Sequence, residues 1–273
     1  MQKPKIRSKF RLFFGRYYFY LKKQLYWRFS GVRFSRETKK TNLKYEIFSH
    51  QTMLLRPLKD VEMWMQHGGV HNLRLAIKKL DGLVLGPGEV FSYWLLIGLP
   101  TQSKGYLDGM VLHNGGFKAG IGGGLCQLSN LIYWMILHTP LSVIERWRHS
   151  YDVFPDANRT QPFGSGATCS YPNIDLQIKN QTQAIFQLRL EITATHLVGR
   201  IFSDKPLATQ YTIEERDHSI KPVWWGGYIR HNRIFKLGFD LKSGEKLSEE
   251  LVAENNAIIM YEPLLQHAHG KNK

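Results

Sequence analysis

The sequence contains no apolar run long enough to cross a membrane. The longest such run in its first 44 residues, at positions 17–21, is shorter than the roughly 7 to 15 apolar residues of a signal-peptide core and the roughly 20 of a transmembrane helix. The apolar segment 131–137 is also too short, because His138 and Pro140 follow it. We therefore expect a cytoplasmic protein that associates at most peripherally with the inner face of the membrane.

Cysteine is scarce, with only Cys126 and Cys169 in 273 residues. In a cytoplasmic chain such a pair is expected to remain as reduced thiols. Cys169 stands apart from other metal-binding residues, and His267 and His269 have no third ligand nearby, so no metal site is predicted. The chain also lacks both the Gly-Lys-Ser/Thr phosphate loop and the dinucleotide-binding glycine pattern. No cofactor is expected.

Acidic residues are nearly absent from the first 44 positions, which hold fourteen Lys or Arg against the single acid Glu37. This leader therefore carries a net charge of +13 out of the +15 of the whole chain. Because the remaining 229 residues are almost neutral, the basic character belongs to the leader and not to the folded body.

The leader interleaves aromatic and basic residues at helical spacing. If it is a helix, its apolar side chains follow the i, i+3, i+4 pattern, and most of its basic ones lie elsewhere. The apolar set is Phe10, Phe13, Phe14, Tyr17, Tyr18, Leu21 and Leu25, and the basic set is Arg11, Arg16, Lys22, Lys23 and Arg28. Such a helix suits an anionic membrane surface, or it packs on the protein's own body. Nucleic acid is the disfavoured partner, because the body is neutral and has no Gly-rich nucleic-acid motif.

Three consecutive glycines, Gly122, Gly123 and Gly124, run directly into an apolar helical pattern at 125–137. Cys126 therefore lies at the start of the predicted helix, where unpaired N–H groups and the helix dipole stabilise a thiolate. The same position also suits a small buried residue at the start of a core helix. The stretch predicts either a nucleophile or a packing site.

A Cys–His–Asp arrangement is one interpretation of the residues that follow. A helix of about 13 residues and a returning strand at 141–147 would bring His149 back toward Cys126. Asp175 lies on a later alternating strand and is the preferred residue to orient the imidazole, ahead of Asp152 and Asp156. Backbone N–H groups of the glycine loop would then supply oxyanion donors.

The remaining sequence predicts an α+β fold, with two or three helices packed on a mainly antiparallel sheet and one helix carrying Cys126 at its N-terminus. A helix is expected around 70–80, an irregular glycine-rich loop system at 98–124, and strands at 83–85, 89–93, 167–171, 174–179, 184–192 and 197–202. We divide the chain into the leader (1–44), a central α+β domain (45–204) and a β-rich C-terminal extension (205–273).

Several motifs, in order, resemble the VanW family over about residues 70–203. They are Asn72-Leu73, Gly86-Pro87-Gly88-Glu89-Val90-Phe91-Ser92, the Gly122 to Tyr133 stretch, Glu145-Arg146 with His149, and Ile174-Asp175-Leu176 with Lys179-Asn180. The resemblance implies an accessory role in glycopeptide resistance or peptidoglycan-precursor metabolism, with a precursor or a cell-wall enzyme as partner. One departure is Gly166, which precedes Ala167 where the family usually has an aspartate.

Two functional hypotheses follow. In the first, the protein is a binding or scaffolding module at the cytoplasmic membrane face, and Cys126 is structural. In the second, it is a cysteine-dependent amidase, peptidase or acyltransferase that acts on peptidoglycan-type peptides. The candidate catalytic residues are Cys126, His149 and Asp175, and the candidate binding-loop residues are Gly122, Gly123, Gly124, Gln127, Ser129, Glu89 and Arg146.

Overall fold

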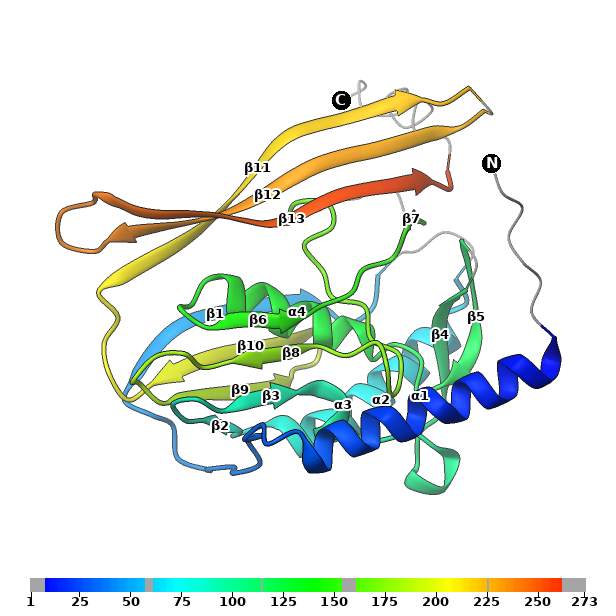
Figure 1. The fold of residues 1–273 in the computed structure, drawn as a ribbon, viewed down its shortest axis with the longest axis horizontal. Coiled ribbons are helices and arrows are strands. Elements are labelled where there is room, and N and C mark those ends of the chain that lie inside the picture. The colour runs from blue at the N-terminus through cyan, green and yellow to red at the C-terminus, as the bar shows by residue number, and fades with distance from the viewer. Residues whose placement is uncertain (1–7, 57–60, 114, 154–160, 225, 262–273) are drawn as a thin grey trace.

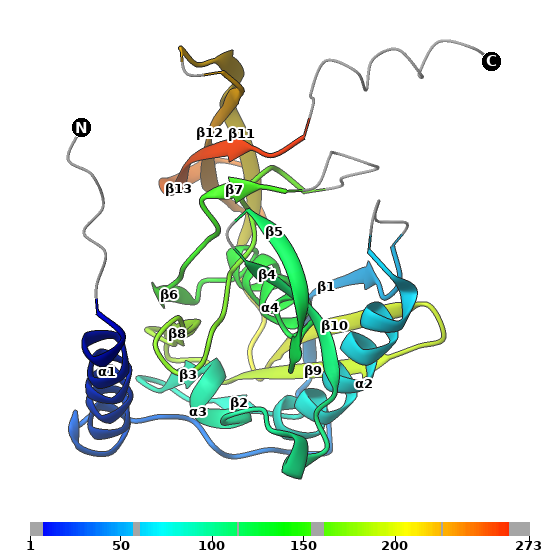
Figure 2. The same ribbon diagram turned by 90° about the vertical axis from the view of Figure 1, so that its right-hand side faces the viewer.

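The computed structural model describes residues 8–56, 61–113, 115–153, 161–224 and 226–261 (Figure 1). Within these residues the chain forms the α-helices α1 (Lys9–Phe29), α2 (Met63–Leu80), α3 (Tyr93–Ile97) and α4 (Cys126–Leu137), and the short 3-10 helix η1 (Gln102–Lys104). None of the described helices is both long and apolar enough to span a bilayer. Figure 2 shows α1 and α2 on opposite sides of the body.

The central sheet has the strand order β1-β10-β9-β2 and is antiparallel throughout. Its strands are β1 (Tyr45–Met53), β10 (His196–Ser203), β9 (Phe186–Ile192) and β2 (Val84–Leu85). Helix α4 lies against this sheet so closely that a Cβ on Gly199 of β10 would be 2.5 Å from the Met135 side chain. Glycine at this position therefore lets the helix approach the strand.

A second antiparallel sheet has the order β3-β8-β6, and a separate hairpin joins two further strands. The sheet strands are β3 (Val90–Ser92), β8 (Gln177–Lys179) and β6 (Ser142–Glu145), and the hairpin strands are β4 (Asp108–His113) and β5 (Gly116–Ile121). The hairpin occupies the region in which the glycine content predicted irregular loops, so that expectation was wrong. Glycine at 115, with φ +78°, provides its tight turn.

The C-terminal strands form their own sheet, in the order β11-β12-β13-β7. Long antiparallel strands β11 (Thr209–Pro222), β12 (Tyr228–Asp240) and β13 (Lys246–Ile259) follow one another, and β13 pairs in parallel with the short β7 (Tyr151–Asp152). Because β7 comes from the central region, the C-terminal strands are joined to the body by backbone hydrogen bonds as well as by the connecting chain.

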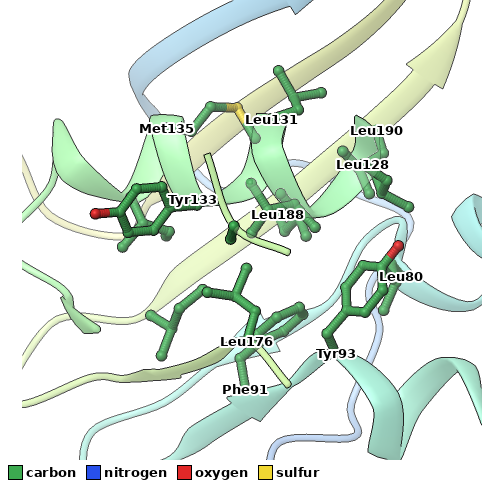
Figure 3. Close-up of a cluster of buried hydrophobic side chains, with 14 of the residues drawn as sticks. Leu80, Phe91, Tyr93, Leu128, Leu131, Tyr133, Met135, Leu176, Leu188 and Leu190 are labelled. Carbon is green, nitrogen blue, oxygen red and sulfur yellow. The ribbon is translucent and has the colours of Figure 1, made fainter. Parts of the chain in front are cut away.

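The core lies around α4, whose side chains are buried on nearly every face (Figure 3). Leu128, Leu131 and Met135 are fully buried, and Tyr93, Leu80 and other side chains of the neighbouring elements close the cluster. A helix that is apolar all round needs cover on all sides, and sheets and helices provide it here. Helix α2 is amphipathic by contrast, and ends where the Asp81 N–H donates to the Ile77 carbonyl.

The α+β prediction is confirmed, including the helix that begins at Cys126. The segment 167–171 is not a strand, because it forms only single bridges, from Thr168 to Trp147 and from Ser170 to Ile174. Strands β1 and β13 were not expected. The first holds an edge of the central sheet, and the second alternates buried and exposed residues only over its second half.

Candidate functional site

The Cys126 thiol lies at the N-terminus of α4 and is partly exposed. Its hydrogen-bond partner is the Cys169 carbonyl oxygen, at an Sγ to O distance of 3.5 Å. Burial raises the pKa of Cys126 and outweighs the lowering effect of that hydrogen bond. Burial also raises the pKa of Cys169, well above its ordinary value. The thiolate-stabilising effect expected at a helix start therefore does not dominate here.

His149 is partly buried, and burial lowers the pKa of its imidazole. Strand β6 ends at Glu145, and the chain then turns toward the C-terminal sheet, where Arg148 donates to the Asn256 carbonyl at 2.9 Å and Ser150 accepts from Ile258 N–H at 3.1 Å. Among the described residues, no hydrogen bond joins the His149 ring to Cys126 or to Asp175. Trp147, two residues before His149, bridges to Thr168, which adjoins the Cys169 that Cys126 contacts, so the approach of His149 to Cys126 stays a prediction.

Asp175 is fully buried and fastens the start of α3. Its carboxylate accepts hydrogen bonds from Ser92 Oγ at 2.6 Å, from the Trp94 N–H at 2.9 Å and from Gln177 Nε2 at 3.2 Å. Burial raises the pKa of Asp175, although these hydrogen bonds and Lys23 lower it in part. The orienting partner of Asp175 is thus a helix N-terminus and not an imidazole.

Lys23 of α1 inserts between two carboxylates of the second sheet. Its Nζ lies 2.8 Å from Glu145 Oε2 and 3.5 Å from Asp175 Oδ2, and its side chain is only 11% exposed. The sequence grouped Lys23 with the solvent-facing cations of the leader, and the structure corrects this. Glu145 and Asp175 both belong to motifs that resemble the VanW family. This resemblance was the available sequence signal that the two carboxylates lie together.

The glycine triplet packs backbone against backbone. A Cβ on Gly123 would lie 2.1 Å from the Gly109 carbonyl carbon in β4, and one on Gly124 would lie 2.6 Å from Gly69 Cα in α2. Asn72 of α2 completes this contact, since its Nδ2 donates to the Gly123 carbonyl at 2.9 Å. Gly122 and Gly124 also have φ values of +76° and +90°, which glycine adopts without strain.

The N–H groups of the triplet donate to backbone carbonyl groups. Gly122 N donates to Leu107 O at 3.0 Å, Gly123 N to Gly120 O at 3.0 Å and Gly124 N to Met110 O at 3.0 Å. These donors are therefore engaged in the fold, and they are not directed at an oxyanion in this structure. The triplet joins α2, the β4–β5 hairpin and the start of α4.

The other candidate binding-loop residues contact the protein's own backbone. Gln127 Nε2 donates to Met53 O at 2.7 Å, and Ser129 Oγ donates to Ala167 O at 2.7 Å. Arg146 Nε donates to Gly166 O at 2.9 Å, and its guanidinium lies 4.8 Å from the Tyr133 ring centroid. Glu89 lies in a different region, where Oε2 accepts from Gly86 N–H at 2.8 Å and braces the turn before β3.

Gly166, where the family usually has an aspartate, is packed tightly in this chain. A Cβ there would lie 2.6 Å from Asn130 Oδ1, which accepts from Ala167 N–H at 2.8 Å. Asn130 thus uses the space that a larger residue would need.

Among the described residues, no group of three His, Cys, Asp or Glu side chains could hold a metal ion. His267 and His269 lie outside the described residues. Of the predicted site, the structure brings together Cys126, Ser129 and the glycine triplet, and it places Asp175 with Lys23 and Glu145 beneath α1. Among the described residues, no hydrogen bond joins the side chains of His149 and Glu89 to either group.

A family model described as "VanW like protein" matches residues 68–202. The vancomycin B-type resistance protein VanW of Enterococcus faecalis (strain ATCC 700802 / V583) is 33% identical over 235 residues, which cover 86% of this chain and 85% of that protein. The uncharacterized protein YoaR of Bacillus subtilis (strain 168) is 32% identical over 133 residues, or 49% of this chain and 42% of that protein. No solved structure matches the chain. The match to the enterococcal protein extends over most of both chains, and the chain belongs to the VanW family.

Proposed function

We propose that this protein is a binding or scaffolding module that α1 anchors to the inner face of an anionic membrane. In this role it engages peptidoglycan precursors or the enzymes that make them. The name of the enterococcal relative, a vancomycin B-type resistance protein, supports the link to resistance against glycopeptides. The exposed aromatic face of α1 carries the membrane part of the proposal.

The apolar residues of α1 form a solvent-facing stripe. Phe10, Phe14, Tyr17 and Leu21 succeed one another at intervals of three or four residues, and their exposed fractions are 78%, 65%, 59% and 40%. Aromatic side chains of this kind insert at the headgroup level of a bilayer. Exposed neighbours such as Arg11 supply the positive charge that attracts anionic lipid.

The opposite face of α1 is fixed to the body. Besides Lys23, Gln24 Nε2 donates to Tyr171 Oη at 3.0 Å, and Tyr26 Oη donates to Gln177 Oε1 at 3.1 Å. Trp27 is only 7% exposed. One face of α1 therefore packs on the body, and the other faces solvent, where it is accessible to a membrane surface. A helix held in this way would orient the body at a membrane surface.

The surroundings of Cys126 support binding over thiol catalysis. A nucleophilic thiol needs a base within hydrogen-bond reach, roughly 2.6 to 3.2 Å, and a lowered pKa. The hydrogen bond of Cys126 goes to a carbonyl oxygen, and burial raises the pKa of the thiol. Cys126 and Ser129 instead help to join α4 to the segment around Ala167 and Cys169.

Vesicle pelleting tests the membrane proposal on the full chain. We expect the wild type to sediment with phosphatidylglycerol-containing vesicles and to dissociate as salt is added. The Phe10→Ala/Phe14→Ala variant should bind at least about tenfold more weakly, because each aromatic ring contributes roughly 1.5 kcal/mol or more when buried. The control is Leu247→Ala/Leu251→Ala, which removes two exposed leucines from β13. Equal binding by both variants would refute the proposal.

A resistance assay tests the role of the thiol. In a host whose vancomycin resistance depends on this protein, a Cys126→Ala variant that folds should retain function if Cys126 is a packing residue. Loss of function in folded Cys126→Ala and Cys126→Ser variants would instead support the cysteine-dependent enzyme.

A further inference from the structure

A groove of about 650 Å³ separates the central sheet from the C-terminal sheet. One wall is residues 45–48 at the start of β1, and the other is residues 209–213 at the start of β11. The connection from β10 to β11, through Pro206 and Leu207, lines the groove together with Leu241. We call this space the edge groove. Figure 1 shows β11 leaving the end of β10 close to β1.

Both walls are the outer strands of their sheets. Within the described part of the chain, β1 pairs only with β10, and β11 pairs only with β12. An outer strand presents a row of unpaired backbone N–H and C=O groups, which is the feature that another strand recognises. The edge groove therefore has hydrogen-bonding capacity that its apolar side chains alone would not suggest.

The orientation of β11 can be read from His138. The carbonyl oxygen of Tyr211 lies 3.1 Å from His138 Nδ1, so this carbonyl points away from β12. Backbone groups of alternate residues point the same way along a strand. The N–H and C=O groups of Thr209 and Ile213 therefore also point away from β12, toward the side of the strand on which the groove lies.

His138 lines the groove and occupies one carbonyl group of the β11 edge. Its ring stacks on Phe48 at a centroid distance of 4.0 Å and meets Trp134 edge-on at 4.9 Å. Because Nδ1 donates to Tyr211 O, Nε2 is a lone-pair acceptor, and it is buried with no partner among the described residues. Burial lowers the pKa of His138, which favours this neutral form. Between these rings Nε2 has almost no accessible surface, so an occupant of the groove would not reach it.

We propose that the edge groove binds a peptide in extended conformation, which adds to β11 as a further strand. About five residues of a strand, at roughly 3.3 Å per residue, match the five residues of β11 that line the groove. Apolar side chains of the peptide would pack against Ile47, Phe48 and Leu207. An acyl chain would fill the apolar space but would leave the outward N–H and C=O groups of the strand edges unpaired. This inference stands independently of membrane binding by α1.

The test begins with a phage-displayed library of random heptapeptides, panned on the full chain. An enriched peptide is then synthesised in a normal form and in a form with alternate amides N-methylated, and the affinities of both are measured by calorimetry. N-methylation removes backbone donors without changing the side chains. We expect it to weaken binding by about tenfold or more.

Two proline variants test the location. Ile213→Pro removes an N–H group that points away from β12, so the β11–β12 hydrogen bonds remain. Ile220→Pro is the matched control outside the groove. Ile213 pairs with Lys236, and Ile220 pairs with Arg230. Because Lys236 and Arg230 are an even number of positions apart on β12, their backbone groups point the same way. The N–H groups of Ile213 and Ile220 therefore both point away from β12. Ile213→Pro should reduce affinity about tenfold, and Ile220→Pro should leave it unchanged.

Three outcomes would overturn the proposal: no peptide enriched above a blank surface, equal binding of the N-methylated peptide, or full affinity in folded Ile213→Pro. If Ile213→Pro does not fold, the affinity difference between the normal and the N-methylated peptide is the test of the proposal. Sedimentation of the wild type gives a further check. A concentration-dependent dimer that the peptide dissociates would mean that a second copy of the chain normally occupies the groove, which also contradicts the proposal.

Discussion

Substituting Lys23 with alanine should release α1 from the body. In the native structure the Lys23 ammonium neutralises two carboxylates, one of which, Asp175, is fully buried. Glu145 is the other, and its side chain is 24% exposed. Removing the cation leaves both charges in a poorly solvated site beneath the helix.

The magnitude follows from burial and from the remaining hydrogen bonds. Removing one partner of a buried ion pair typically costs about 3 to 5 kcal/mol. Here the loss is smaller, because Glu145 reaches solvent and Asp175 keeps its hydrogen bonds from Ser92, Trp94 and Gln177. We expect about 2 kcal/mol, which corresponds to roughly a 30-fold increase in the population of molecules with α1 undocked.

Hydrogen exchange of the backbone amides in residues 20–29 measures this population directly. Lys22→Ala is the matched control, since Lys22 is the adjacent lysine on the same helix and is exposed. Lys23→Ala should exchange faster in α1 while the core amides of α4 stay protected. Equal protection of α1 in the two variants would refute the conclusion that Lys23 holds α1 against the body.

The pH dependence of this effect has a definite sign. The pKa of Asp175 is raised above its ordinary value of 3.8, so the folded protein holds the proton to higher pH than the unfolded chain does. The free energy of unfolding should therefore fall as pH rises from 3.8 through the raised pKa. Lys23 is among the groups that lower this pKa, so the fall should extend to higher pH in Lys23→Ala.

Three further outcomes are expected. Gly123→Ala should destabilise the fold by roughly 3 kcal/mol in urea unfolding, because its Cβ would collide with Gly109. The control is Gly116→Ala, whose Cβ would have its nearest neighbour at 3.7 Å and which should change stability by less than about 0.5 kcal/mol. Alkylation of Cys126 by iodoacetamide should stay slow up to pH 8 and accelerate only above pH 9, since burial raises the pKa of the thiol above 9.0; a rate that levels off below pH 8 would contradict this. Burial lowers the pKa of Lys236 from 10.5 to about 8, so between pH 8 and 10.5 the unfolded chain holds more protons than the folded protein. The free energy of unfolding of the wild type should therefore rise by about 3 kcal/mol over this range. The Lys236→Met variant should not show this rise.

Local patterns in the sequence were enough to predict the helix and strand content of the body. The apolar spacing that ends at Asp81 identified α2, and the continuous apolar run after Gly124 identified α4. Both helices owe their formation to their own residues. The same holds for the alternating strands β9 and β10, which lie near their predicted positions.

Elements that depend on distant partners were harder to predict. Glycines at 109 and 120 suggested loops, yet they sit opposite each other in the β4–β5 hairpin, where Gly109 lets the triplet approach. The Cys–His–Asp hypothesis relied on spacing along the chain. Spacing cannot show that the segment after β6 turns toward β13, where Arg148 and Ser150 form hydrogen bonds.

Lys23 shows the same limit in the leader. As one of six basic residues in an aromatic helix it has no distinguishing local signal, and its role arises only where the helix meets Glu145 and Asp175. Tyr26 and Trp27 likewise stand in the aromatic pattern, but they face the body. Helical periodicity separates two faces of α1, and the tertiary contacts decide which face is buried.

The distribution of charge and the position of α1 together favour one orientation in the proposed membrane-bound state. The leader carries +13 of the net charge of +15, and six of its fourteen basic residues belong to α1. Figure 1 shows α1 and the β11–β13 sheet on opposite sides of the body. A protein bound through the aromatic stripe of α1 would therefore hold the β11–β13 sheet away from the lipid. Membrane anchoring and peptide binding would then occur together. Lys23, which joins α1 to Glu145 and Asp175, would fix the orientation of the body relative to the membrane-bound helix.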